Sequence, residues 1–109
     1  MNRVLALTLL LATTTATAQP NPDPAALEAS GSKHFELAEY PAAIADFKEA
    51  FRISDRPELL FNIAQAYRLA GDCVQARTFY KTFLRRVPDA PNADKVRARI
   101  DGPCAEAAP

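Results

Sequence analysis

The sequence predicts an all-α protein made of two helix hairpins and one closing helix, and three observations carry this prediction. Apolar residues recur at three- and four-residue spacing in several stretches, which is the period of an amphipathic helix. Prolines and glycines fall where these stretches begin or end. No stretch alternates polar and apolar residues in the way that a half-buried strand does.

The N-terminal segment, residues 1–18, has the layout of a secretory signal peptide. Arg3 supplies a short positive head, residues 4–12 are apolar, and the segment ends in an A-x-A cleavage site at Ala18. The apolar stretch is far shorter than the ~20 residues that span a bilayer, so we expect cleavage near Ala18 rather than a membrane anchor. The mature protein would then be periplasmic or secreted, and we expect a bacterial cell envelope.

Residues 19–24 form the expected lead-in to the helices. Their sequence is QPNPDP, and three prolines in six residues exclude a helix interior or a central strand. We therefore expect an extended, flexible segment here. The last residues, 105–109, are expected to form a disordered tail.

Three apolar stripes predict the helices that follow. They are Ala43, Ile44, Phe47, Ala50 and Phe51; Leu60, Ile63, Ala64 and Tyr67; and Ala76, Tyr80, Phe83, Leu84 and Val87. Pro41 and Pro57 suit the first turn of a helix, where no amide hydrogen bond is lost. Gly71 can take the left-handed conformation that ends a helix, and Asp72 can cap the next one.

A short closing helix is predicted after Pro88, which ends the preceding helix at about Val87. The sequence NADKVRARID, residues 92–101, places Val96 and Ile100 on one face at i, i+4 spacing. Gly102 and Pro103 then end it. Residues 91–104 thus form a capping helix and a tail that carries a cysteine.

The chain also repeats itself at a shift of 33 residues, with small residues meeting small ones and large residues meeting large ones. The pairs are Leu27 with Leu60, Gly31 with Ala64, His34 with Tyr67, Ala38 with Gly71, Ala43 with Ala76, Phe47 with Tyr80, and Phe51 with Leu84. A helix pair is therefore the repeated unit. The small residues allow the paired helices to approach closely, and the aromatic residues fill the space between pairs.

This pattern resembles the tetratricopeptide repeat, a helix-turn-helix unit of about 34 residues. The second unit, residues 57–90, matches the family well through Leu60, Ala64, Tyr67, Gly71, Ala76 and Tyr80, although Phe83 replaces a usual small residue. The first unit, residues 25–56, is degenerate, because Ser30 and His34 replace large apolar or Tyr residues in its first helix. The resemblance implies a fragment of an α-solenoid.

The resemblance also implies a concave groove that binds a peptide or a partner segment, with no catalytic activity. The first unit would offer Glu28, Ser32, Phe35 and Glu36 to this groove, and the second would offer Phe61, Asn62, Gln65, Arg68 and Leu69. Some family members hold a terminal carboxylate at the position of Asn62. Glu28 and Ser32 replace the basic and amide residues of that clamp, so we expect an apolar strip rather than a carboxylate clamp. Asn62 as a plain surface amide, and Phe61 and Leu69 as core residues, remain alternatives.

Two repeats and a cap leave a small core, and a small exported domain often needs a covalent staple. Cys73 lies at the start of the second unit's second helix. Since the closing helix returns antiparallel, Cys104 at its far end can reach Cys73. An even cysteine count in an oxidising compartment favours a disulfide, worth roughly 3–4 kcal/mol in the chain-entropy model. A metal site and a reactive thiol are the less favoured alternatives.

Charge and motif content argue against several function classes. With Arg3 removed, the chain holds 12 basic and 13 acidic side chains, too balanced for general attraction to nucleic acid. The acids gather in the first half, whereas Arg77, Lys81 and Arg85 follow one helical face of the second half, as a solvated face or a patch for an acidic partner. His34 is the single histidine, and no catalytic motif, metal-ligand set or cofactor motif occurs.

These observations predict a non-catalytic protein–protein interaction module of the cell envelope, without cofactor or metal. The expected partner is a protein or a peptide, with homo- or hetero-oligomers possible and no membrane span. The alternative is a structural subunit or scaffold within a larger envelope assembly.

Overall fold

The computed structural model describes Val4, residues 8–16 and residues 22–103. Within them the chain forms five α-helices and no strand, so the predicted all-α fold is confirmed. The helices are α1 (Pro24–Glu36), α2 (Tyr40–Ser54), α3 (Glu58–Leu69), α4 (Cys73–Arg86) and α5 (Ala93–Asp101). Ala18, Cys104 and the tail 105–109 lie outside the described residues. Residues 8–16 have no regular secondary structure and are exposed.

The helix boundaries follow the residues that the sequence indicated. Asp23 caps α1 by accepting a hydrogen bond from the Ala25 amide, and Asp72 caps α4 by accepting one from the Gln75 amide at 3.1 Å. Gly71, between α3 and α4, has a φ of 85°, the left-handed conformation expected of it. Ala38 has a φ of 59° at the equivalent place between α1 and α2.

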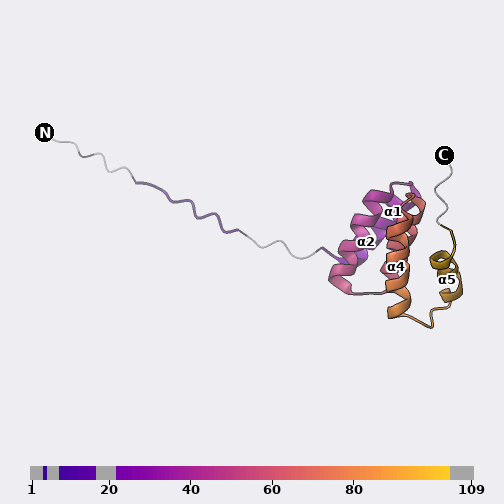
Figure 1. Ribbon diagram of the computed structural model, residues 1–109. Coiled ribbons are helices and arrows are strands. Elements are labelled where there is room, and N and C mark those ends of the chain that lie inside the picture. Colours follow the sequence, from indigo (N-terminus) through magenta and orange to yellow (C-terminus); the bar gives the residue numbers. More distant parts are fainter. Residues whose placement is uncertain (1–3, 5–7, 17–21, 104–109) are drawn as a thin grey trace.

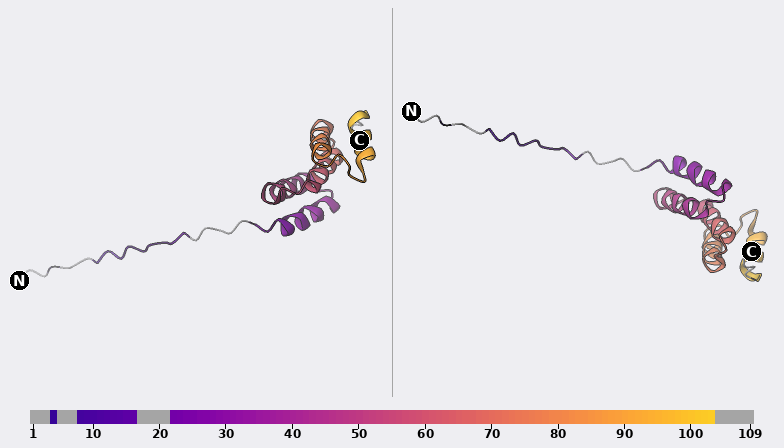
Figure 2. Two further views of the ribbon diagram at one scale, coloured as in Figure 1. Left: turned by 90° about the horizontal axis from the view of Figure 1, so that it is seen from below. Right: turned by 90° about the horizontal axis from the view of Figure 1, so that it is seen from above.

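The five helices form a linear stack. Each helix packs mainly against its neighbours in sequence: α1 against α2, α2 against α3, α3 against α4, and α4 against α5. Figures 1 and 2 show the two hairpins side by side, with α5 on the outer side of α4. This arrangement is an α-solenoid fragment of two helix hairpins and a closing helix, as the repeat predicted.

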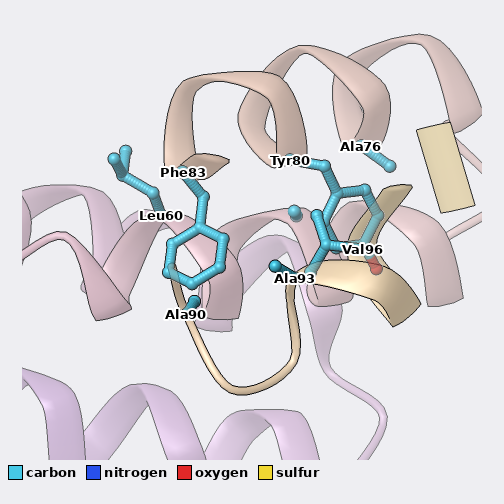
Figure 3. Packing of buried hydrophobic residues seen from close by; sticks show 8 residues of the cluster. Leu60, Ala76, Tyr80, Phe83, Ala90, Ala93 and Val96 are labelled. Carbon is cyan, nitrogen blue, oxygen red and sulfur yellow. The ribbon is translucent and has the colours of Figure 1, made fainter. Parts of the chain in front are cut away.

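Two apolar clusters hold the stack together, one at each junction. The first joins α1, α2 and α3, and Phe47 within it is 3% exposed. The second joins α3, α4 and α5, and Tyr80, the repeat equivalent of Phe47, is 1% exposed. Figure 3 shows the Tyr80 ring next to Val96 and Ala93 of α5. Both aromatic residues therefore fill the space between layers, as the sequence predicted.

A close approach between α1 and α2 depends on Gly31. A Cβ atom at Gly31 would lie 2.7 Å from Cε1 of Phe47, well inside van der Waals contact. The ring of Phe47 therefore occupies the space that a side chain at position 31 would need. Gly31 is also the one buried residue of α1.

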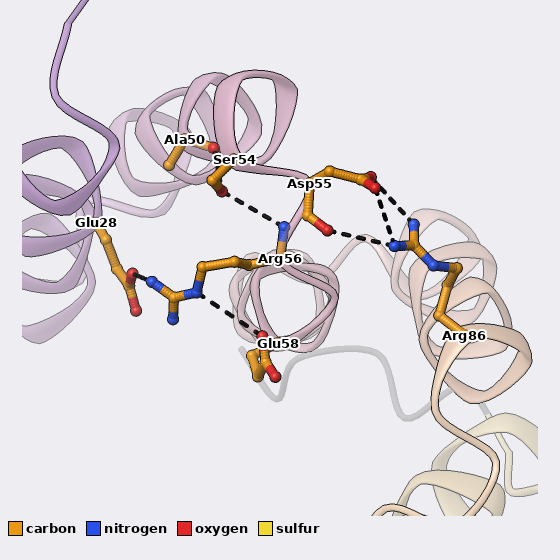
Figure 4. Close-up of polar contacts among 7 residues, drawn as sticks. All are labelled: Glu28, Ala50, Ser54, Asp55, Arg56, Glu58 and Arg86. Carbon is orange, nitrogen blue, oxygen red and sulfur yellow. Dashed lines mark hydrogen bonds and ion pairs between the residues drawn. The ribbon is translucent and has the colours of Figure 1, made fainter.

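Polar contacts clamp the connection between α2 and α3 from both sides, as Figure 4 shows. Arg56 donates to Glu28 of α1 at 2.7 Å. Arg86 of α4 donates to both carboxylate oxygens of Asp55 at 3.2 Å and to its backbone carbonyl. The connection between the hairpins is thus tied to the helices on either side of it.

Helix α5 runs back along α4 toward the end at which α4 begins (Figure 1). Arg77, one turn into α4, donates to the backbone carbonyl of Gly102, which follows α5. This contact fixes the end of α5 beside the first turn of α4, where Cys73 lies. None of the helices in the described part of the chain is long and apolar enough to cross a membrane.

Candidate partner-binding pocket

A pocket of about 440 Å³ lies between the first helices of the two hairpins. Its lining comes from α1, α2 and α3, and consists of Ser32, Phe35, Glu36, Phe47, Phe61, Asn62 and Gln65. A volume of this size is within the range of small-ligand pockets and exceeds that of a single side chain.

Three phenylalanines form the apolar part of the pocket, and each is held by a second aromatic residue or by tight packing. Phe35 packs edge-on against Tyr40 with ring centroids 5.6 Å apart. Phe61 packs against Phe83 at 5.6 Å. Phe47 is buried under Gly31. Because these rings are fixed by the core, the pocket is preformed rather than assembled on binding.

Two amides of α3 form part of the polar rim. The Gln65 side-chain oxygen accepts hydrogen bonds from the Tyr80 hydroxyl and from Nε of Arg68. This orientation leaves the Gln65 amide nitrogen as the donor that has no partner among the described residues. Asn62, one turn earlier on α3, makes no side-chain hydrogen bond to any described residue. Both amides can therefore pair with the backbone of a bound segment.

Four of the residues that the sequence predicted for the groove, Phe35, Phe61, Asn62 and Gln65, line the pocket together. Arg68 instead turns toward Tyr80, where its Nε lies 3.3 Å from the hydroxyl. Leu69 is exposed at the end of α3 and does not line the pocket.

Of the other groove candidates, Ser32 and Glu36 line the pocket and Glu28 does not. Glu28 is held by Arg56 in the contact shown in Figure 4. Sequence reasoning treated Phe47 as core and missed that its ring also reaches the pocket. The signal was the glycine at position 31, since the absence of a side chain there lets the ring of Phe47 lie against the backbone of α1.

His34 does not line the pocket. Its Nδ1 is 3.1 Å from Glu39 and its Nε2 is 3.8 Å from Asp46. Phe35, the next residue on α1, is the one that packs on Tyr40. The histidine is thus engaged by two carboxylates rather than directed toward the pocket lining.

The charged groups differ in how they are partnered. On the exposed face of α2, Arg52 donates to the Glu49 carboxylate at 2.6 Å and holds the pKa of that carboxyl below its ordinary value. This pair lies outside the pocket. Glu36 is the one charged residue that lines the pocket, and it is exposed.

Residues 4, 8–16 and 22–103 contain no group of three or more His, Cys, Asp or Glu side chains arranged to hold a metal ion. Cys73 opens α4, and its predicted partner Cys104 lies outside the described residues. The disulfide therefore stays a prediction, with the contact between Arg77 and Gly102 bringing the flanking segments together.

No protein-family model, no curated protein and no solved structure gives a significant match to this chain.

Proposed function

We propose that this chain is an exported, tetratricopeptide-like repeat protein that binds a segment of another protein in the pocket between α1 and α3, without chemistry of its own. The observation that supports it best is the meeting of a fixed apolar floor with two amides that have unused hydrogen-bonding capacity. An extended segment offers both an apolar side chain for the floor and backbone groups for the amides.

The test uses peptides selected from a phage-displayed random library on the full chain. Binding of the selected peptides is then measured by fluorescence anisotropy with Ser32→Tyr, which adds a large side chain at the exposed rim of the pocket. We expect affinity to fall at least about tenfold, because the added ring occupies the space of the ligand side chain. If wild type and Ser32→Tyr bind the peptides with equal affinity, the pocket is not the binding site.

Ala98→Tyr is the matched control, since it adds the same ring to an exposed position of α5, outside the pocket. We expect it to bind as wild type does. A loss in both variants would indicate a general effect of the added ring, and would contradict the assignment of the site.

A structural role in a larger assembly is the second candidate, and exposed aliphatic side chains favour it. Leu37, Leu69 and Val74 are 59%, 38% and 73% exposed, and all three lie at the turns within the hairpins. Such residues could pack against a larger body. Sedimentation velocity distinguishes the two candidates: a monomer that binds selected peptides supports the first, and an oligomer broken by Val74→Lys supports the second.

Export is part of the proposal and has its own test. The A-x-A sequence at Ala18 supports cleavage there, and the exposure of residues 8–16 leaves this segment available to a peptidase. The intact mass of the protein recovered from the envelope of an expressing bacterium should correspond to a chain that begins at Gln19. A mass that retains residues 1–18 would contradict export with cleavage.

A further inference from the structure

Glu36 differs from the other acidic side chains of the first hairpin and its connections in having no partner. Every other acid between residues 22 and 58 contacts a hydrogen-bond donor or a cationic side chain. These contacts join Asp23 to the Ala25 amide, Glu28 and Glu58 to Arg56, Glu39 and Asp46 to His34, Glu49 to Arg52, and Asp55 to Arg86. Among the described residues, Glu36 makes neither an ion pair nor a side-chain hydrogen bond.

This carboxylate is also the one charge on the lining of the pocket. It lies one residue after Phe35 on α1, so the apolar floor and the negative charge are adjacent. Two nearby arginines are engaged elsewhere, Arg56 by Glu28 and Arg68 by Gln65 and Tyr80. Lys33, three residues before Glu36 on α1, is exposed and makes no ion pair with Glu36. Because no cation among the described residues lines the pocket, a cation of the bound segment can pair with Glu36 there.

The electrostatic field of the whole domain also favours a cationic ligand at the pocket. Residues 22–58 hold eight acidic and four basic side chains, whereas residues 73–103 hold three acidic and seven basic ones. The pocket is lined by residues of the acidic hairpin and of α3. A cationic segment is consequently attracted toward the pocket and repelled from α4 and α5.

We infer that the segment bound in the pocket carries a Lys or Arg close to a large apolar side chain, which enters between Phe35 and Phe61 while the cation pairs with Glu36. This inference rests on the proposed function and specifies its ligand. Charge complementarity selects this occupant over an acidic segment, which Glu36 and the surrounding field would repel.

The test compares peptide selections on wild type, Glu36→Gln and Glu36→Lys. Wild type should enrich peptides with Lys or Arg within a few positions of an apolar residue. Glu36→Gln should lose that enrichment, and Glu36→Lys should shift it toward Asp and Glu. A wild-type peptide should bind Glu36→Gln about fivefold more weakly, as when one partner of a partly exposed charge-assisted hydrogen bond is removed.

Glu58→Gln is the matched control, because it removes the same charge from an exposed position of α3 that does not line the pocket. It should keep the enrichment of wild type. Loss of the enrichment in both variants would assign the preference to the general field and overturn the pairing with Glu36.

The remaining outcomes separate this inference from the proposed function. Peptides that are blocked by Ser32→Tyr but show no basic enrichment would overturn the role of Glu36 and leave the pocket as a binding site. Peptides that bind Ser32→Tyr as well as wild type would overturn the site itself. Self-association of the wild type that Glu36→Gln abolishes would assign Glu36 to a contact with a second copy and overturn the inference.

Discussion

Helices α1 and α3 open the two hairpins at equivalent places, yet only α3 is enclosed. Of the 12 residues of α3, five are buried: Leu59, Leu60, Ile63, Ala64 and Ala66. Of the 13 residues of α1, only Gly31 is buried. The difference follows from position, since α3 packs against both α2 and α4 whereas α1 packs mainly against α2.

The comparison shows which contacts position a terminal helix that buries few of its side chains. Helix α1 is fixed by the fit of Gly31 to Phe47, by the ion pair of Glu28 with Arg56, and by a hydrogen bond of 2.6 Å from Ser30 to Asp46. These contacts fix one face of α1. The face toward α3 is left partly open, and the pocket lies there.

The largest effect is expected from truncating the two equivalent leucines. Leu60→Ala removes a side chain that is 2% exposed, and should lower the free energy of unfolding by about 2–5 kcal/mol. Leu27→Ala removes a half-buried side chain of α1, and should cost roughly 1 kcal/mol because less apolar area leaves water there. Urea unfolding followed by circular dichroism measures both, and equal losses would show that α1 is as enclosed as α3.

The two ends of the stack should also respond differently to removal of the cysteines. If Cys73 and Cys104 are bridged, Cys73→Ala with Cys104→Ala should lower the free energy of unfolding by about 3 kcal/mol, because the loop closed by the bridge gains freedom in the unfolded chain. Amide exchange should rise mainly in α5. Two titratable thiols in the denatured, unreduced protein would contradict the bridge.

A smaller effect is expected at the close approach of α1 to α2. Gly31→Ala places a methyl group 2.7 Å from the Phe47 ring and should cost about 1–3 kcal/mol. At the equivalent position in α3, Ala64→Gly should cost about 2 kcal/mol, because it lowers helix propensity and also removes a fully buried methyl group. Urea midpoints give both values.

Phe47→Leu provides the check on this mechanism. In its background Gly31→Ala should lose most of its cost, because the ring that meets the new methyl group is gone. A cost that persists unchanged in the double variant would contradict the steric explanation.

The sequence predicted the elements well because their signals are local. Pro57, Gly71 and Asp72 act within a few residues of themselves, so the helix boundaries could be placed to within about one residue. The pairing of Phe47 with Tyr80 came from the repeat and predicted both junctions of the core. The hydrophobic period, together with the prolines, glycines and capping residues, is sufficient to predict the helices and the main core residues.

The pocket could be predicted only in part, because some of its features depend on distant partners. Arg68 lies on the expected helix, but its guanidinium turns to Tyr80, 12 residues further on. That the Glu36 carboxylate forms no ion pair can be seen only from the three-dimensional positions of the cationic side chains. Which partner a polar side chain contacts depends on how the helices pack, and the spacing of residues in the sequence does not indicate it.

The smallest effects should have opposite signs at the two turns within the hairpins. Ala38 has a φ of 59° and Gly71 a φ of 85°, and a residue with a Cβ atom is strained in this left-handed region. Ala38→Gly should therefore raise the free energy of unfolding by about 0.5 kcal/mol, after the entropy that glycine adds to the unfolded chain is subtracted. Gly71→Ala should lower it by about 1 kcal/mol. Urea midpoints that move in the same direction for both variants would show that the two turns are not equivalent, and would break the correspondence between the hairpins at this position.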